Sequence, residues 1–254
     1  MTTPRLPQKY RLVELDEIGS TNEEAKRLAS DGAPEGTLVW AHRQTAGRGR
    51  RGREWISERG NLFTSIILRP DCVPPQAVQL TFAAALAVRD MVALHIEDGD
   101  TVACKWPNDV LVSGRKISGI LLESSTAGKG SVEWLVLGVG VNLRHHPEIS
   151  DRHPSTSLYD EGAGEVDEAV ALEEFTGAFS RRWNMWREGG FQPIHKAWLE
   201  HAYGLGEMAS IKLESGVHEG RFIGIDKSGA LRLKASGCGE SLYSAGDVTF
   251  EESG

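Results

Sequence analysis

The sequence predicts an α+β protein that ends in a small β-barrel. Several strand-like segments follow one another in the middle of the chain, and two long amphipathic segments come after them. From about Gly204 the pattern changes to short alternating runs separated by glycine-rich turns, which is typical of a small barrel. We therefore divide the 254 residues into a larger domain, 1–204, and a C-terminal domain, 205–254.

The first part of the chain is expected to hold three strands and one helix around a long loop. Residues 11–18 alternate between apolar and polar as an edge strand does. Thr21 and Glu24 form a capping box, which predicts a helix that stops near Gly32. The next elements are a strand at 37–42, a loop rich in glycine and arginine at 44–60, and a buried strand at 62–68.

The rest of the large domain begins with a helix. Residues 75–96 are expected to form it, because a proline opens the segment and apolar residues recur at helical spacing. Strands and then two amphipathic helices follow. The expected segments are the strands 102–105, 110–112, 117–123 and 132–139, the helices 166–187 and 193–202, and the C-terminal strands 209–213, 221–225 and 230–234.

Composition narrows the class of protein. Lys plus Arg number 28 and Asp plus Glu 36, and the net charge of −8 disfavours indiscriminate binding to nucleic acid or anionic membranes. Cys72, Cys104 and Cys238 are widely spaced and form no CxxC pair, which fits a reducing compartment. The apolar runs are far shorter than the ~20 residues of a membrane span, and the N-terminus has no apolar signal core. The sequence therefore predicts a cytoplasmic protein.

The densest chemical signal is the segment 47–53, Gly-Arg-Gly-Arg-Arg-Gly-Arg. Glycine lets backbone amides approach an anion closely, and guanidinium groups bind phosphate or carboxylate with two parallel hydrogen bonds. The segment therefore predicts an anion site. A solvated basic loop and an arginine-rich RNA-binding segment are the alternatives. The segment also matches G-x-G-x-x-G, but another strand follows instead of a helix, so we reject a dinucleotide site.

A second motif is the segment 105–109, Lys-Trp-Pro-Asn-Asp, between two expected strands. Proline fixes its own φ and restricts the residue before it, so a rigid corner is expected to present Lys105, Asn108 and Asp109. A lysine beside an amide and a carboxylate suits the recognition of phosphate and hydroxyl groups. A turn with no function beyond its Asn-Asp geometry is the alternative.

Two strands combine glycines with polar residues. Lys116 opens an apolar strand in which Gly119 leaves room for a backbone or a ligand, although an exposed lysine at a strand start is the simpler interpretation. The segment 138–142, Gly-Val-Gly-Val-Asn, ends a strand with two glycines that leave room and with Asn142, which can hydrogen-bond a ligand. A β-bulge explains this segment equally well.

Other catalytic patterns are missing from the sequence. His145, His146 and His153 have no cysteine or acidic partner at metal-ligand spacing, so we expect solvated loop histidines. No Gly-x-Ser-x-Gly elbow, no P-loop and no cysteine in a catalytic setting occurs. The tryptophans between residues 183 and 198 are expected to belong to the core.

In their order along the chain, these motifs resemble those of the biotin protein ligases. The resemblance runs from about residue 12 to the C-terminus, and the arginine-rich segment together with the Lys-Trp-Pro-Asn-Asp corner is highly specific. It implies a mixed sheet flanked by helices, related to the class II aminoacyl-tRNA synthetase core, and an SH3-like C-terminal barrel. The matching segments are Ser20-Thr21-Asn22, Gln44, 47–53, 105–109, Lys116 with Gly119, and 138–142.

The resemblance also implies an activity. Such enzymes activate biotin with ATP to biotinyl-5'-AMP, with Mg²⁺ and release of pyrophosphate, and a lysine of a biotin carboxyl carrier protein of acetyl-CoA or related carboxylases then attacks the acyl carbon. In such enzymes the protein supplies no nucleophile, which fits the absence of serine, cysteine and histidine catalytic patterns from this sequence. Repressor members carry an N-terminal helix-turn-helix domain, whereas about ten residues precede the first strand here, so a ligase-only type without DNA binding is expected. The choice between monomer and homodimer stays open.

Site roles follow from the same resemblance, residue by residue. The biotin-binding residues would be Ser20, Thr21, Asn22, Gln44, Arg48, Gly49, Arg50, Lys116 and Gly119. The ATP-binding residues would be Arg51, Arg53, Lys105, Asn108, Asp109 and Asn142. The catalytic residues would be Lys116, Arg50, Lys105 and Asp109, with the arginine-rich segment in a mobile lid. Lipoate ligases share the fold and reaction type but not this segment, and a nucleic-acid-binding module is the alternative that is not an enzyme.

Overall fold

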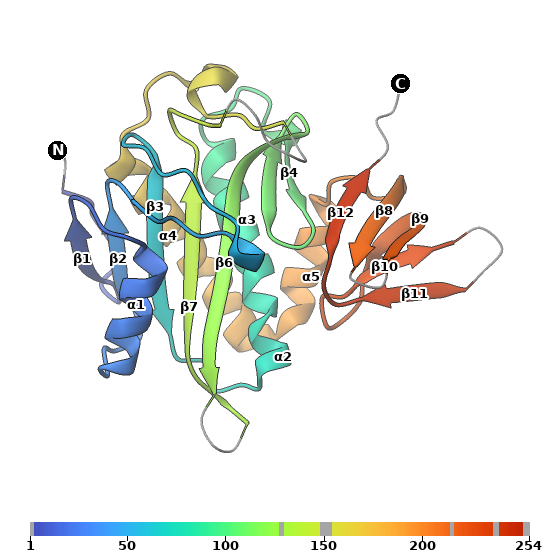
Figure 1. Ribbon diagram of the computed structural model, residues 1–254, viewed down its shortest axis with the longest axis horizontal. Coiled ribbons are helices and arrows are strands. Elements are labelled where there is room, and N and C mark those ends of the chain that lie inside the picture. Colours follow the sequence, from blue (N-terminus) through green and yellow to red (C-terminus); the bar gives the residue numbers. More distant parts are fainter. Residues whose placement is uncertain (1–2, 127–129, 148–153, 214–215, 236–238, 251–254) are drawn as a thin grey trace.

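The computed structural model describes residues 3–126, 130–147, 154–213, 216–235 and 239–250 (Figure 1). Within them, a seven-stranded mixed sheet has the order β1-β2-β3-β7-β6-β5-β4, in which the pair β1 and β2 is parallel and the other pairs are antiparallel. Its strands are β1 (Arg11–Leu15), β2 (Thr37–Ala41), β3 (Leu62–Leu68), β4 (Val102–Lys105), β5 (Asp109–Val112), β6 (Arg115–Thr126) and β7 (Val132–Val141).

Helices cover both faces of this sheet. Figure 1 shows one helix in front of the sheet and the others behind it. The front helix buries Ala25 and Ala29 against Val39, Ile67 and Val136 of the sheet. The helices are α1 (Thr21–Ser30) in front, and α2 (Pro74–Ala77), α3 (Gln79–Ala93), α4 (Glu168–Gly189) and α5 (Phe191–Glu200) behind.

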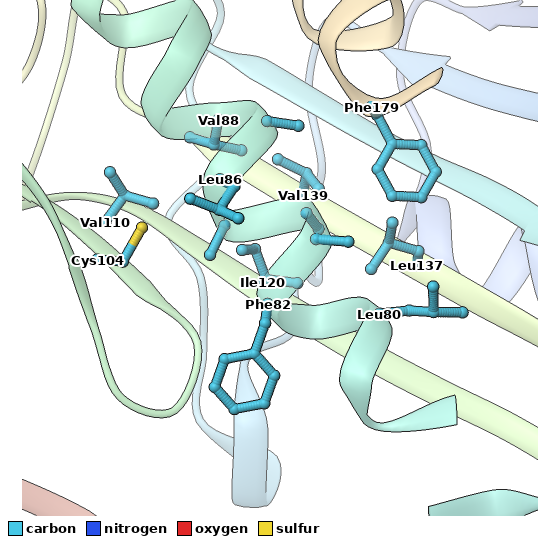
Figure 2. Packing of buried hydrophobic residues seen from close by; sticks show 14 of the residues in the cluster. Leu80, Phe82, Leu86, Val88, Cys104, Val110, Ile120, Leu137, Val139 and Phe179 are labelled. Carbon is cyan, nitrogen blue, oxygen red and sulfur yellow. The ribbon is translucent and has the colours of Figure 1, made fainter. Parts of the chain in front are cut away.

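The main core lies between the sheet and the rear helices. Figure 2 shows side chains of α3, among them Leu86 and Phe82, beside Ile120, Leu137 and Val139 of the sheet. Because successive side chains of a strand point to opposite faces, the residues between these core positions face the front. In β3 and β7 these front residues include Ser65, Gly138 and Gly140, which are small. These small residues let side chains from other elements approach the front face closely.

The C-terminal strands form a second sheet in the order β11-β10-β9-β8-β12, with antiparallel pairs throughout. Its two edge strands are not paired with each other within the described residues, so this sheet is open there and the predicted closed barrel is not confirmed. The strands are β8 (Met208–Leu213), β9 (Gly216–Ile225), β10 (Leu231–Lys234), β11 (Glu240–Tyr243) and β12 (Asp247–Phe250).

The small sheet contacts the large domain through buried side chains. The indole nitrogen of Trp106 donates a hydrogen bond to the carbonyl oxygen of Gly229 at 3.0 Å. Gly229 has a φ of +89°, and a Cβ there would lie 2.6 Å from the ring of Phe82. Glycine is therefore required at this turn both for its conformation and for the close contact with α3.

Most predicted elements are present, two local predictions are wrong, and one alternative is ruled out. The capping box does not form: Ser20 is the N-cap residue, its side chain makes no capping bond, and the Thr21 hydroxyl donates to Gln44 instead. The helix expected at 75–96 is divided at Val78 and ends at Ala93. The β-bulge considered for 138–142 is absent, because the register of β7 with both neighbours is regular there.

The described residues hold neither a disulfide nor a membrane-length apolar helix. Cys72 and Cys104 are free and buried, and Cys238 lies outside the described residues. In the ranges given above, no helix has the length and apolar character needed to cross a bilayer.

A buried histidine connects three elements at the end of β2. His42 is 6% exposed, and its Nδ1 lies 2.8 Å from Glu168 of α4 while its Nε2 lies 3.0 Å from Glu14 of β1. Carboxylates only accept hydrogen bonds, so both ring nitrogens donate when the imidazole is protonated. Burial lowers the pKa of His42, but the bonds to Glu168 and Glu14 outweigh burial, and the pKa is raised above 6.5.

This geometry predicts pH-dependent stability. A raised folded pKa means that the contribution of His42 is complete below pH 6.5 and is lost as the pH rises through the folded pKa. We expect His42→Gln to lower the free energy of unfolding by about 1–2 kcal/mol at pH 6 and by less at pH 9. Urea titrations at both pH values measure the difference. The exposed His145 supplies a control, His145→Gln, and a pH-independent loss in His42→Gln would contradict the prediction.

Candidate active site

A pocket of about 530 Å³ opens on the front face of the large sheet. The fold brings together there almost all of the residues predicted from the sequence. Those that line it are Ser20, Thr21, Asn22, Gln44, Arg48, Gly49, Arg50, Arg53, Lys105, Asn108, Asp109, Lys116, Gly119 and Asn142. They come from segments separated by more than a hundred residues, so the pocket is a product of the sheet topology.

One end of the pocket is built mainly from neutral polar side chains, beside the ion pair of Arg48 with Glu23 and the carboxylate of Glu123, which accepts from Asn22 at 2.9 Å. The side-chain oxygen of Gln44 accepts hydrogen bonds from the Thr21 backbone at 2.8 Å and from the Thr21 hydroxyl at 3.1 Å. The hydroxyl of Ser65 lies 2.6 Å from Oδ1 of Asn22 and 2.8 Å from Oγ1 of Thr21. Thr21, which was expected to cap α1, thus belongs to a network of neutral donors and acceptors with Gln44, Ser65 and Asn22. Such a network suits a ligand with an uncharged amide-like group.

Glycines in the sheet make room for this end and for an aromatic wall. A Cβ on Gly138 would collide with the side chain of Asn22, and one on Gly140 would lie 2.5 Å from the indole nitrogen of Trp55. A Cβ on Gly119 would lie 2.9 Å from the same indole. Side chains at these strand positions would therefore displace the residues that shape the pocket.

Trp55 is a pocket residue that the sequence analysis missed. It contributes an apolar surface, and the ammonium of Lys116 lies 5.5 Å from its ring centroid. Its buried indole nitrogen has no hydrogen-bond partner among the described residues. The available signal was the pair of strand glycines, 119 and 140, which indicated that a bulky group approaches the sheet.

The segment that carries Trp55 folds over the pocket as an ordered turn. We call residues 44–60 the arginine loop. Figure 1 shows it crossing the front of the large sheet. The amide of Trp55 donates to Gly47 at 2.9 Å, and the amide of Gly49 donates to Arg53 at 2.7 Å, so the tip 48–54 forms a small hairpin. Arg48 pairs with Glu23 of α1, which connects the loop to the front helix.

The other end of the pocket is rich in cations. Arg50 donates a hydrogen bond to Asn108 at 2.8 Å, and the ammonium of Lys116 lies 2.6 Å from Asp109. Burial lowers the pKa of Arg50. Lys105 is 4% exposed, and burial, partly offset by Asp109, lowers its pKa to about 8. Desolvated cations attract anions strongly, so this end is suited to phosphate and carboxylate groups.

The Lys-Trp-Pro-Asn-Asp corner places part of this charge. Its Trp106-Pro107 peptide bond is cis, and the corner joins β4 to β5. Asn108 is held by a bond from its amide to the carbonyl oxygen of Ile120 at 2.8 Å. Oδ1 of Asp109 is buried and lies close to Lys116, but without the alignment of a hydrogen bond. At a separation of 2.6 Å the two opposite charges form an ion pair.

One sequence expectation is wrong here, and two placements were not foreseen. Arg51 lies outside the pocket lining and pairs with Asp247 of β12, and its role in ATP binding stays a prediction. Asp247 and Val248 do line it, although the small sheet gave no such signal in the sequence. His146 is half-buried and bonded to Asp160 and Ser155, so it is not a solvated loop residue, and His153 lies outside the described residues.

Sequence comparison finds relatives along most of the chain. Residues 15–142 match the model of the biotin/lipoate A/B protein ligase family. The biotin--[acetyl-CoA-carboxylase] ligase of Paracoccus denitrificans is 41% identical over 91% of this chain and 97% of its own length. The bifunctional ligase/repressor BirA of Bacillus subtilis is 36% identical over 92% of this chain and 72% of its own length.

Structural comparison agrees with these relatives. The biotin protein ligase from Aquifex aeolicus in complex with biotin and ATP is similar with a TM-score of 0.79 and 27% identity, over 94% of this chain and 98% of the other. The matched family region contains the arginine loop, the corner and the glycine-bearing strands that together form the pocket. By sequence and by fold, the chain belongs to the biotin/lipoate A/B protein ligase family.

Proposed function

We propose that this protein is a biotin protein ligase. It activates biotin with ATP to biotinyl-5'-AMP and pyrophosphate, and it transfers biotin to a lysine of the biotin carboxyl carrier protein or domain of acetyl-CoA or related carboxylases. The observation that carries the proposal is one pocket with a neutral hydrogen-bonding end and a cationic end, closed on one side by the arginine loop. Biotin has an uncharged ureido ring at one end and a carboxylate at the other.

The neutral end fits the ureido ring. Thr21, Asn22 and Gln44 supply fixed donors and acceptors, and the indole of Trp55 supplies apolar contact area. Because these polar groups already hold one another in place, a ligand that matches them meets little reorganisation. This arrangement supports the assignment of Ser20, Thr21, Asn22, Gln44 and Gly119 to biotin binding.

The cationic end fits the chemistry of acyl activation. A carboxylate becomes a good acyl donor once it is joined to AMP, but the reacting carboxylate and the triphosphate are both anions. Arg50, Lys105 and Lys116 surround the place where they would meet. These cations offset the repulsion and stabilise the negative charge that develops, while the pocket holds the two reactants together. We assign Lys116, Arg50, Lys105 and Asp109 to this step, and Arg53, Asn108 and Asn142 to ATP binding.

A Mg²⁺ ion that accompanies ATP is compatible with the residues present. Magnesium is commonly held by one or two carboxylates together with substrate phosphates. Asp109 lines the pocket, and its buried Oδ1 pairs with the ammonium of Lys116 at 2.6 Å, so a metal ion held there would take the place of that contact. We therefore propose Asp109 as the protein ligand, and the ion would neutralise phosphate charge when bound.

The second half-reaction needs no nucleophile from the enzyme. The amine of the acceptor lysine attacks the acyl carbon, and AMP leaves. The role of this chain is to hold the mixed anhydride and to exclude water. Trp55 and the arginine loop lie over the sheet and can do both. A cytoplasmic location and the absence of DNA binding stay predictions from the sequence. The choice between monomer and homodimer stays open.

One assay separates the candidate activities. Biotin-dependent release of pyrophosphate from ATP is expected, with little release when lipoate replaces biotin. Salt-dependent binding of RNA without any such release would favour the nucleic-acid-binding alternative instead.

Lys116→Ala should abolish most of the adenylation. The loss of one charged contact at the reacting centre costs about 2.7–4 kcal/mol by analogy with oxyanion sites, or about 100- to 1000-fold in rate. The initial rate of pyrophosphate release at saturating biotin and ATP measures this. Lys227→Ala at an exposed turn of the small sheet is the control. An unchanged rate in Lys116→Ala would remove the residue from the catalytic assignment.

Arg50→Gly should release the intermediate rather than prevent its synthesis. Arg50 connects the arginine loop to Asn108 of the corner, and without this bond the loop opens more often. The mixed anhydride then escapes and acylates lysines of an unrelated bystander protein such as serum albumin, which a biotin blot detects. Arg43→Gly, outside the pocket, is the matched control. Negligible bystander labelling together with intact acceptor labelling would place Arg50 outside the lid.

We also infer that residues 205–254 act as a domain of their own, related to an SH3-like barrel. The support is that, within the described residues, strands β8 to β12 pair only with one another. Their buried side chains nevertheless join the same hydrophobic cluster as those of the large domain. A fragment 1–204 should stay soluble and bind biotin, but should transfer it poorly to the carrier protein, because the pocket loses Asp247 and Val248. Acceptor biotinylation at the full-length rate would contradict this role. An insoluble fragment would show that the two parts share one core and that the boundary is wrong.

A further inference from the structure

We propose that Asp247 of the small sheet is a positioning residue that stabilises the arginine loop in its place over the pocket. Its effect on catalysis rests on the proposed function, whereas its effect on the loop does not. The two parts of the proposal can therefore fail separately.

The carboxylate of Asp247 bridges two arginines of the loop tip. Its Oδ2 lies 3.0 Å from Nη1 of Arg51, and its Oδ1 lies 2.9 Å from Nη2 of Arg53. Each oxygen thus serves a different arginine. The Asp247 side chain is 18% exposed, less than either partner at 47%, so this carboxylate is the more sheltered side of the contact. A sheltered carboxylate shared by two guanidinium groups is more favourable than an isolated surface pair.

The backbone that carries Asp247 is firmly placed. Asp247 opens β12 and pairs in register with Lys212 of β8. The preceding Gly246 packs so closely that a Cβ there would lie 2.5 Å from Cδ1 of Ile211, and the following Val248 is buried. The core of the small sheet therefore fixes the position of the carboxylate. The loop tip has no comparable core, because its arginines are partly exposed.

The loop tip needs such support. Arg51 has a φ of +58°, in the left-handed region that residues with a side chain rarely adopt. Arg50, Arg51, Arg53 and Lys105 also bring several positive charges close together. Asp247 interacts favourably with both Arg50 and Lys105, so its charge acts on the whole cationic end. Without Asp247, repulsion among these cations would favour an open loop.

Contacts that favour the closed loop have a consequence for ligand binding. Ordering a flexible segment on binding costs free energy, and contacts that already favour the ordered position reduce that cost. In the wild type, Asp247 would therefore lower the KM for ATP and biotin rather than raise kcat. In the alternative role, the Asp247 carboxylate competes with nucleotide phosphates for Arg51 and Arg53. Removing it would then lower the KM for ATP.

The first test uses the full-length protein without ligands. Hydrogen exchange of peptides covering residues 45–57 reports on loop amides such as those of Gly49 and Trp55, which are hydrogen-bonded within the loop. Asp247→Asn should accelerate their exchange by about 3- to 10-fold. Asp247→Glu, which keeps the charge, should restore much of the protection. The control is Glu240→Gln, which breaks the ion pair with Arg232 in the same sheet at a distance from the pocket.

Exchange in Asp247→Asn that equals wild type and Glu240→Gln would overturn the proposal. Faster exchange throughout β8 to β12 would also overturn it, because that result indicates a general structural role. The second test measures pyrophosphate release: the KM for ATP and biotin should rise about 3- to 10-fold in Asp247→Asn, with kcat nearly unchanged. A lower KM for ATP would show competition instead. If the wild type lacks the activity, the proposed function fails, and hydrogen exchange still decides the role of Asp247.

Discussion

The small residues on the front face of the large sheet are the constraint on which the site depends. Helices pack on the rear of the sheet, where most strand residues are large and apolar. The alternate positions face the front, where Gly119, Gly138 and Gly140 leave a hollow. Asn22 and Trp55 fill part of that hollow, and the remaining space is the pocket. A single methyl group at Gly138 or Gly140 would displace Asn22 or Trp55, respectively. The shape of the pocket therefore depends on having glycine at these two positions of β7.

The charges of the pocket are arranged on top of this shape. The chain as a whole is acidic, with a net charge of −8, yet its arginine loop and its corner direct cations to one end of one cavity. Two carboxylates, Asp109 and Asp247, keep those cations together without neutralising them. The cations are partly or fully desolvated, and they therefore act more strongly on an anion than the same groups would on an open surface. The chain carries a net negative charge, which disfavours the binding of polyanions. The pocket is locally positive and therefore favours small anions.

Motif residues were predictable because each one solves a local chemical problem. Glycine beside arginine, lysine at the start of an apolar strand, and a proline corner before Asn-Asp are visible in the chain without any knowledge of the fold. The resemblance to a family then placed these motifs in one site, and the structure brings nearly all of them to one pocket. The capping prediction was wrong because Thr21 has partners outside its own helix. Thr21 and Glu24 have the spacing of a capping box, but the Thr21 hydroxyl donates to Gln44 and accepts from Ser65 instead.

The sequence by itself determined the class of fold, most of the strands and helices, and the types of side chain that carry the chemistry. Periodicity and turn residues act over a few positions, and these signals survive without tertiary contacts. Only the tertiary structure decided which residues meet. Trp55 covers Gly119 and Gly140, and Asp247 holds Arg51 and Arg53 from a different sheet. No local pattern reports such contacts, because they depend on strand order and on the packing of the small sheet against the large domain. The sequence also could not report whether the two edge strands of the small sheet pair with each other. A closed barrel was expected, but within the described residues these strands are not paired.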